Sequence, residues 1–409
     1  MAFMLNFEIN ISKIKSIYKN QVKNDENFII NYARTINYFG RVVLSNCTSN
    51  NLLKKICSVA ECYLMMSSPK FETIKSVLQM GVKKVIIPEK DVKNIGQKIS
   101  KNIIIARVTL QPFLQIKYNL QIKWLNSYLL NLKEDLKEIF NRVNPYCSEF
   151  LIDYDEDLNM DESTVLAVID YITDFTKYPL TFLDTNNRFT EAIEKKGVNP
   201  FIRSSGMFEE KEMLKIFKSA LDFQKLEGLI PTIVQDEHNQ ILMLAFSSQD
   251  SLTQALIQKK GIYYSRSRKS IWIKGETSEN YQTLNQVRYD CDQDALLFKV
   301  RQEGVACHLQ RYSCFGNKEF KLLDLYEVIQ NRILKPVAGS YTSKISKDER
   351  LIIEKIKEES NEVINYTNEE NLTWEIADLL YFIMVLMAKK GIKLQDILNE
   401  LRSRRNYGN

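Results

Sequence analysis

Residues 290–300 read Asp290-Cys291-Asp292-Gln293-Asp294-Ala295-Leu296-Leu297-Phe298-Lys299-Val300. The apolar half of this run is rich in residues that favour β-structure and predicts a strand. If the acidic half continues that strand, its aspartates share one face and Cys291 points to the other, because side chains alternate along a strand. The run then offers a hard oxygen site and a soft sulfur site back to back.

Two further cysteines, Cys307 and Cys314, follow within residues 261–316, and His308 stands beside the first. Thiolates favour zinc, whereas clustered carboxylates favour magnesium or a similar hard ion. A solvated acidic turn with buried thiols is the alternative. The clustering of both ligand types in one segment favours metal binding.

Composition excludes several classes of protein. At 409 residues the chain predicts two or three domains. Its 44% hydrophobic and 26% charged residues are typical of a soluble globular protein, and a formal charge of +5 without a basic block indicates no nucleic-acid surface. Seven cysteines, an odd number, favour a reducing compartment. The longest apolar run, residues 379–388, is too short to span a membrane, and the N-terminus is unlike a transit peptide. We expect a cytoplasmic protein.

Residues 1–222 alternate short apolar runs with amphipathic segments. Repeated strand–helix units imply parallel pairing, and seven or eight of them predict a closed β/α barrel, with an open doubly wound sheet as the alternative. The expected strands are residues 41–44, 62–66, 84–87, 103–106, 149–152, 180–183 and 200–202, and the expected helices include 71–80, 162–173 and 188–195.

The sequence around residues 67–87 and 150–159 resembles that of the phosphoribosyl-isomerase barrels of histidine biosynthesis. Those barrels rely on acidic residues at the ends of two strands and on glycine-rich phosphate loops. Here the strand at 103–106 leads into Arg107 without an obvious acid, and the loops contain Asp184-Thr185-Asn186-Asn187 and Arg203-Ser204-Ser205-Gly206. Backbone amides approach a phosphate most closely where side chains are absent. We therefore expect a degenerate barrel that acts as a scaffold, in which Asp153 and Asp155 cap a strand end.

The middle domain, residues 223–317, begins with expected strands at 232–236 and 241–245 and a helix at 249–259, which makes it β-rich α+β. A basic loop follows, Tyr264-Ser265-Arg266-Ser267-Arg268. Guanidinium groups beside hydroxyls suit a phosphate, and a solvated basic loop is the alternative.

The span from 229 to 316 closely resembles phosphoribosyl-AMP cyclohydrolase. Besides the basic loop, the marks are Trp272 with Lys274-Gly275-Glu276-Thr277-Ser278, the acidic run at 290–295, Cys307-His308 and Ser313-Cys314-Phe315. The resemblance implies zinc on Cys291, Cys307 and Cys314, magnesium on Asp290, Asp292 and Asp294, and a homodimer whose protomers share the zinc cysteines. Zinc lowers the pKa of a bound water, and His308 is the candidate for proton transfer. The expected substrate contacts are Ser265, Arg266, Arg268, Lys274, Glu276, Thr277 and Ser278.

Residues 318–409 are helical by pattern, with helices expected at 324–334, at 347–366 capped by Ser346, and at 373–390. The last of these is apolar nearly all round and is expected to be buried. It nevertheless carries Glu375 and Asp378, one turn apart, while Glu359 interrupts the apolar stripe of the preceding helix. A salt bridge from the carboxylates of 375 and 378 to Lys355 or Lys357 is the structural alternative to a metal.

These carboxylates resemble those of phosphoribosyl-ATP pyrophosphohydrolase, one of the all-α nucleotide pyrophosphohydrolases, which hold magnesium with Glu-Glu-x-x-Glu plus Glu-x-x-Asp. The resemblance covers about residues 322–405 and implies a phosphate-side loop at Ser340, Tyr341 and Thr342. It implies that magnesium is held on the triphosphate by Glu358, Glu359, Glu362, Glu375 and Asp378.

The two domains together imply consecutive steps of histidine biosynthesis on small phosphoribosyl nucleotides, with zinc and magnesium as cofactors. The barrel followed by two enzymes resembles the front part of the fungal multifunctional histidine enzyme. Two other classes stay open: a pair of enzymes acting on damaged nucleotides, and a structural zinc protein.

Overall fold

The computed structural model describes residues 5–17, 26–110, 135–154, 161–174, 176, 179–185, 188–203, 207–225 and 227–405. The chain divides into two compact units. The first comprises Met1–Asn317 and Ser403–Asn409, and the second comprises Lys318–Arg402.

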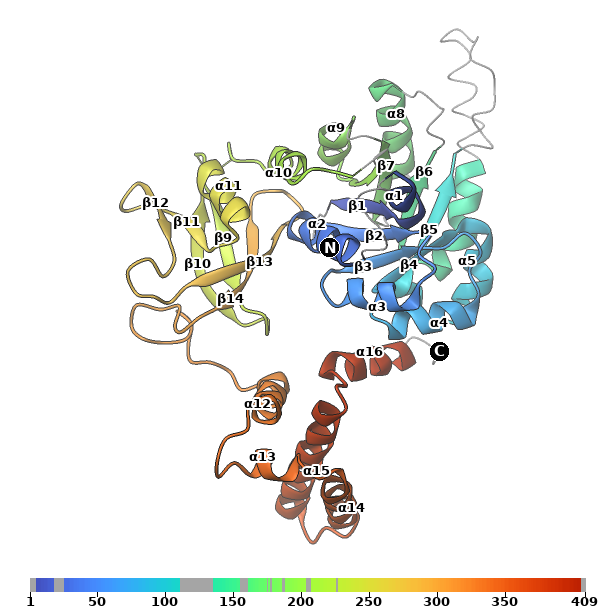
Figure 1. Ribbon diagram of the computed structural model, residues 1–409. Helices are drawn as coiled ribbons and strands as arrows, with labels where there is room; N and C mark the ends of the chain where they lie inside the picture. The colour runs from blue at the N-terminus through green and yellow to red at the C-terminus, as the bar shows by residue number, and fades with distance from the viewer. Residues whose placement is uncertain are drawn as a thin grey trace. The chain divides into compact units, whose positions relative to one another are not determined.

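Eight parallel strands close a barrel in the order of the sequence (Figure 1). The first strand pairs with both the second and the eighth, and this double pairing closes the ring. The predicted closed barrel is confirmed, and the open sheet is not formed. The strands are β1 (Asn6–Asn10), β2 (Arg41–Ser45), β3 (Cys62–Met65), β4 (Lys84–Pro88), β5 (Ile104–Thr109), β6 (Glu149–Asp153), β7 (Leu180–Thr185) and β8 (Asn199–Arg203).

Most barrel strands are apolar without interruption because both of their faces are buried. Strand β1 is the one that the sequence did not predict, since Asn6, Glu8 and Asn10 break up its apolar pattern. Helices pack around the strands (Figure 1). They are α1 (Ile11–Ile17), α2 (Glu26–Phe39), α3 (Asn50–Cys57), α4 (Phe71–Gln79), α5 (Glu89–Gly96), α8 (Glu162–Thr173), α9 (Thr190–Lys195) and α10 (Glu210–Ser219), with short 3-10 helices at Lys101–Ile103 and Asn144–Tyr146.

A four-stranded sheet of order β10-β9-β14-β13 forms the middle of the chain. Strands β9 and β14 are parallel neighbours, and the outer pairs are antiparallel. The elements are β9 (Ile230–Gln235), β10 (Ile241–Ser247), α11 (Gln249–Gln258), the hairpin β11 (Ile262–Ser265) with β12 (Ser270–Ile273), β13 (Gln282–Tyr289) and β14 (Leu296–Gln302). The β-rich middle fold predicted from the sequence is confirmed.

The barrel and the middle sheet share one hydrophobic core. Buried residues from Leu5 to Ala306 form a continuous cluster that spans both elements of the first unit. Within it, Phe217 of α10 contacts the rings of both Phe39 and Tyr289, with centroid distances of 6.2 and 5.4 Å. The sheet therefore packs against the barrel, and Tyr289, the last residue of β13, contacts a barrel side chain.

The second unit is helical, as predicted, and its core includes Tyr326, Ile352 and Val385. Helix α14 is capped by Asp348, whose side chain accepts a hydrogen bond from the Arg350 amide, so the expected cap by Ser346 is wrong. Ser346 is instead the C-cap of the short preceding helix, and Lys347 lies in the turn between the two helices. The helices are α12 (Leu322–Leu334), α13 (Tyr341–Ile345), α14 (Glu349–Ile364), α15 (Glu369–Lys389) and α16 (Leu394–Arg405).

The expected burial of α15 is wrong within a single chain. Side chains such as Trp374 and Leu380 are 60% and 42% exposed, because the few helices of this unit cover only part of its circumference. By length and composition alone α15 could cross a membrane, and only 22% of its most apolar 18-residue stretch is buried. That is weak evidence, since core helices of soluble proteins pass the same test, and α15 carries Glu375 and Asp378 in its N-terminal half.

Candidate functional sites

The barrel mouth is occupied by ion pairs. Arg203 binds Glu8 at 2.5 Å and lies 3.5 Å from Asp153, and the Nε of Arg107 donates to Asp153 at 2.6 Å. Glu8, Arg107 and Arg203 line a cavity of about 250 Å³, which Ser45 also lines. Arg107 stands on β5, where the isomerase-like barrels would carry an acid. Asp153 pairs with arginines, whereas Asp155 lies outside the described residues.

The carboxylate of Asp184, at the end of β7, holds its own loop together. It accepts hydrogen bonds from the amides of Arg188 and Phe189, at 2.8 and 3.1 Å, and from the hydroxyl of Thr190. Burial raises its pKa. This carboxylate is used by the fold. The neighbouring expected loop residues Asn186, Asn187 and 204–206 lie outside the described residues.

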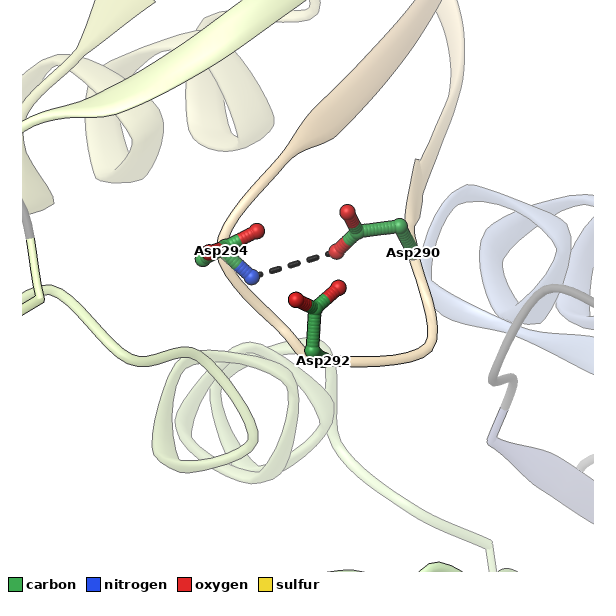
Figure 2. A group of neighbouring side chains, drawn as sticks. All are labelled: Asp290, Asp292 and Asp294. Carbon is green, nitrogen blue, oxygen red and sulfur yellow. Dashed lines mark hydrogen bonds between the residues drawn. The ribbon is translucent and has the colours of Figure 1, made fainter.

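The acidic triplet lies in a turn between β13 and β14, so the expected continuous strand is wrong (Figure 2). The carboxylate of Asp290 accepts hydrogen bonds from the amides of Asp294 and Ala295, both at 3.1 Å, and Gln293 takes a left-handed φ of 65°. These contacts fold the run back on itself instead of letting it extend. We call residues 290–295 the acidic loop.

The turn still gathers the three carboxylates. Oxygens of Asp290, Asp292 and Asp294 lie within 4.8 Å of one another. Burial raises the pKa of Asp290, and the neighbouring Asp292 adds to the shift. Lys225 reaches into the group and binds Asp292 at 3.1 Å and Asp294 at 2.5 Å. The arrangement therefore accepts a positive charge, as a cation site must. Lys225 carries no local sequence signal and was not predicted.

Two of the three expected zinc cysteines lie together. Cys307 is buried and Cys314 exposed, yet the two thiols are within hydrogen-bonding reach; partial burial, and then the Cys307 thiol, raise the pKa of Cys314. Cys291 is exposed on the acidic loop, where its thiol lies 3.9 Å from Asp292. Among the described residues, the groups of three or more potential ligands within 4.8 Å contain only carboxylates. His308 is exposed beside Cys307.

The expected substrate residues of the middle domain lie on and around the β11–β12 hairpin. Ser265 accepts hydrogen bonds from the amide and the Nε of Arg268, at 3.3 and 3.4 Å, and Arg266 stacks 3.8 Å over the ring of Phe246. Burial lowers the pKa of Lys274, with the Cys314 and Cys307 thiols acting in the opposite direction. The exposed turn that follows β12 contains Glu276, Thr277 and Ser278.

The helical unit brings together carboxylates from α14 and α15. Oxygens of Glu359, Glu375 and Asp378 lie within 4.8 Å of one another, and Glu359 is only 6% exposed. Burial raises the pKa of Glu359, and Glu362 and Asp378 add to the shift. A hydrogen bond to Glu375 raises the pKa of Glu362. Mutual repulsion of this kind is relieved by a bound cation.

The alternative salt bridge is not formed among the described residues. Lys355 binds Glu358 at 2.8 Å and lies 3.9 Å from Glu359, so it pairs along its own helix and not with Glu375 or Asp378. The expected phosphate-side loop begins α13, where Ser340 caps the helix and Tyr341 is exposed. The hydroxyl of Thr342 is hydrogen-bonded to that of Tyr381 on α15 at 2.7 Å, a partner that the sequence did not indicate.

Two family models of hydrolases match the second half of the chain. Residues 243–316 match the family model of phosphoribosyl-AMP cyclohydrolase, and residues 322–405 match that of phosphoribosyl-ATP pyrophosphohydrolase. The middle sheet and the helical unit thus correspond to two hydrolase domains joined in one chain, as the sequence predicted.

Similar full-length proteins define the family more closely. The chain is 41% identical over 199 residues to the histidine biosynthesis bifunctional protein HisIE of Pyrococcus furiosus, which covers 45% of this chain and 95% of that protein. The corresponding protein of Bacillus subtilis is 40% identical over 192 residues, or 44% of this chain and 92% of that protein. The chain therefore belongs to the family of histidine biosynthesis bifunctional proteins, which confirms the predicted class of enzyme.

A larger relative matches over the same part. The histidine biosynthesis trifunctional protein of Kluyveromyces lactis is 40% identical over 188 residues, or 46% of this chain. The chain spans only 24% of the length of that relative.

Proposed function

We propose that this chain carries out two consecutive hydrolyses of histidine biosynthesis. The helical unit converts phosphoribosyl-ATP to phosphoribosyl-AMP and pyrophosphate, and the middle domain then hydrolyses the N1–C6 bond of the purine ring. The observation that carries this proposal is the pairing of each family match with its own group of three close carboxylates. The enzyme acts in the cytoplasm on small phosphoribosyl nucleotides.

In the helical unit, the residues that hold magnesium on the triphosphate are Glu358, Glu359, Glu362, Glu375 and Asp378. The raised pKa of Glu359 supports this set, because burial beside other carboxylates is costly without a cation. Magnesium bound there neutralises charge on the leaving pyrophosphate. Ser340, Tyr341 and Thr342 supply hydroxyls for the phosphates, with Thr342 held in place by Tyr381.

In the middle domain, Asp290, Asp292 and Asp294 hold magnesium. The Lys225 ammonium between Asp292 and Asp294 supports this assignment, since it stands where a cation's charge is stabilised. Arg266 and Arg268, with Ser265, bind the substrate phosphate through charge-assisted hydrogen bonds. Lys274, Glu276, Thr277 and Ser278 complete the substrate contacts.

Cys307 and Cys314 of one chain, with Cys291 of a second copy, hold zinc. A catalytic zinc needs three protein ligands, and the two close thiols of a single chain fall one short, while Cys291 is exposed and available to a second copy. Zinc bound there supplies an activated water at neutral pH. His308 moves the proton, as its exposed position beside Cys307 permits. The functional form is accordingly a homodimer through this domain.

The barrel resembles the phosphoribosyl isomerases in fold but serves as a scaffold without isomerase activity. Its mouth supports this view, because the arginines there are engaged by Glu8 and Asp153. Turnover of the phosphoribosyl-formimino product by the purified full-length protein would contradict it.

One experiment tests the central proposal. Purified protein incubated with phosphoribosyl-ATP, zinc and magnesium releases pyrophosphate and then the ring-opened product, which mass spectrometry identifies. Damaged nucleoside triphosphates serve as the comparison. Preference for those substrates indicates a nucleotide-scavenging pair, and a zinc with four protein ligands by X-ray absorption indicates a structural site.

A further inference from the structure

The acidic loop is joined to the barrel by residues just before it. Tyr289, the last residue of β13, is only 2% exposed, and its hydroxyl donates to Glu194 of α9 at 3.0 Å. Glu194 is itself 4% exposed, and its second oxygen has no hydrogen-bond partner among the described residues. The ring of Tyr289 also contacts Phe217 of α10. The residue next to Asp290 is thus anchored in the barrel.

Arg288 adds a second attachment. Its guanidinium donates to the carbonyls of Asn37 and Gly40 at 3.1 and 3.2 Å, where helix α2 ends. The last carbonyls of a helix lack partners within the helix, and a cation is favoured at that end. The side chain is only 5% exposed, so it is committed to this contact. Nearby, the side-chain Nε2 of Gln286 donates to the side-chain oxygen of Asn37 at 3.2 Å.

The loop itself has a third attachment. The amide of Asp222, which follows the last barrel helix, donates to the carbonyl of Gln293 at 3.0 Å. Gln293 is the residue with the left-handed backbone, so this bond acts on the point that turns the loop back. Tyr289, just before the loop's first carboxylate, and Gln293, between its last two, are therefore both bound to residues of the first 222 positions.

We infer that the barrel acts as a positioning element for the cyclohydrolase, holding the acidic loop in its folded-back shape through Tyr289 and Glu194. The metal role of the loop rests on the proposed function, whereas its positioning by the barrel does not. The degenerate barrel then has a structural role in a neighbouring active site. A loop that is folded correctly only part of the time binds its ligand more weakly by that fraction.

Hydrogen–deuterium exchange of the metal-free full-length protein tests the positioning. The amides of Asp290, Asp294 and Ala295 are hydrogen-bonded inside the loop and report its closure. In Tyr289→Phe and in Glu194→Leu, we expect them to exchange about five- to tenfold faster, the effect of losing one buried hydrogen bond. The second variant leaves the middle domain's own sequence untouched.

Two controls define the result. Tyr263→Phe removes another buried tyrosine hydroxyl, which donates at 2.6 Å to Gln282 at the opposite end of β13, a hydrogen bond within the middle domain. Glu194→Gln keeps an acceptor for Tyr289. Both should exchange like the wild type. Loop exchange that is equal in Tyr289→Phe, Glu194→Leu and these controls would overturn the inference.

A magnesium titration separates the inference from the proposed function. We expect the magnesium concentration for half-maximal ring opening to rise by the same five- to tenfold in both test variants, with pyrophosphate release unchanged. Faster exchange without that rise supports the positioning of the loop and contradicts its magnesium role.

Discussion

In the acidic loop, all three carboxylates come from one short turn, whereas in the helical unit Glu359 lies on α14 and Glu375 and Asp378 on α15. Both groups reach the same spacing within 4.8 Å. Glu375 and Asp378 are brought together by α15 alone, since residues three apart on a helix face the same way, and the packing of α14 against α15 adds Glu359. The turn is instead held by its own amides and by contacts to Asp222 and Glu194. A turn can place three ligands within a few residues, but its shape depends on hydrogen bonds to other parts of the fold.

Removal of a zinc ligand should give the largest effect and make the two sites separable. We expect Cys307→Ser to lose bound zinc and to slow ring opening by roughly a hundredfold or more, because even residues that only support a ligand affect a metal site up to that extent. Zinc content and product formation from phosphoribosyl-AMP measure this. Pyrophosphate release should be unchanged, with Cys147→Ser, a buried barrel thiol, as the control. Full zinc content in the Cys307 variant would contradict the assignment.

The helical site should respond to a change of charge alone. Glu359→Gln keeps the side chain's shape and should slow pyrophosphate release from phosphoribosyl-ATP by roughly a hundredfold, as loss of one transition-state interaction commonly does. Supplied phosphoribosyl-AMP should still be opened at the normal rate. Asp292→Asn is the matched variant in the other site and should give the reverse pattern. Loss of both activities in either folded variant would refute the assignment of two sites.

The buried barrel carboxyl beside the loop should make stability depend on pH. Burial raises the pKa of Glu194 from 4.5 to about 8. The folded state then binds more protons than the unfolded state between these values, so the contribution is complete below about 4.5 and is lost as pH rises through about 8. We expect a loss on the order of a few kcal/mol in the free energy of unfolding between pH 6 and 9.

Urea unfolding at those two pH values measures this loss. Glu194→Gln should show much less of it, whereas Glu191→Gln, an exposed carboxylate on the same helix, should behave like the wild type. The same pH dependence in all three proteins would mean that another group titrates.

The smallest effect concerns the lysines beside the two carboxylate groups. Lys225 pairs with Asp292 and Asp294, and Lys355 with Glu358. Because exposed ion pairs contribute little, we expect Lys225→Met to lower the magnesium concentration for half-maximal ring opening by only about two- to threefold. Lys355→Met should do the same for pyrophosphate release alone. A higher magnesium requirement in the Lys225 variant would show that this lysine supports the loop instead of competing with the metal.

The sequence by itself determined the parts that depend on local periodicity. Seven of the barrel's strands were predictable because a strand buried on both faces is apolar throughout, while polar residues in β1 concealed it. Glu359, Glu375 and Asp378 were recognisable because they break apolar helix faces at helical spacing. The family motifs were likewise readable in order along the chain.

The tertiary structure decided the shape and support of the acidic loop. Its residues read as a strand, but Asp290 binds the loop's own amides and turns the chain back. Arg288 and Tyr289 carried no signal in the sequence, and their partners, Gly40 and Glu194, lie far away in the sequence. Helical and strand periodicity is a property of neighbouring residues. A buried hydrogen bond between distant segments exists only after the fold has brought them together, so no local pattern reveals it.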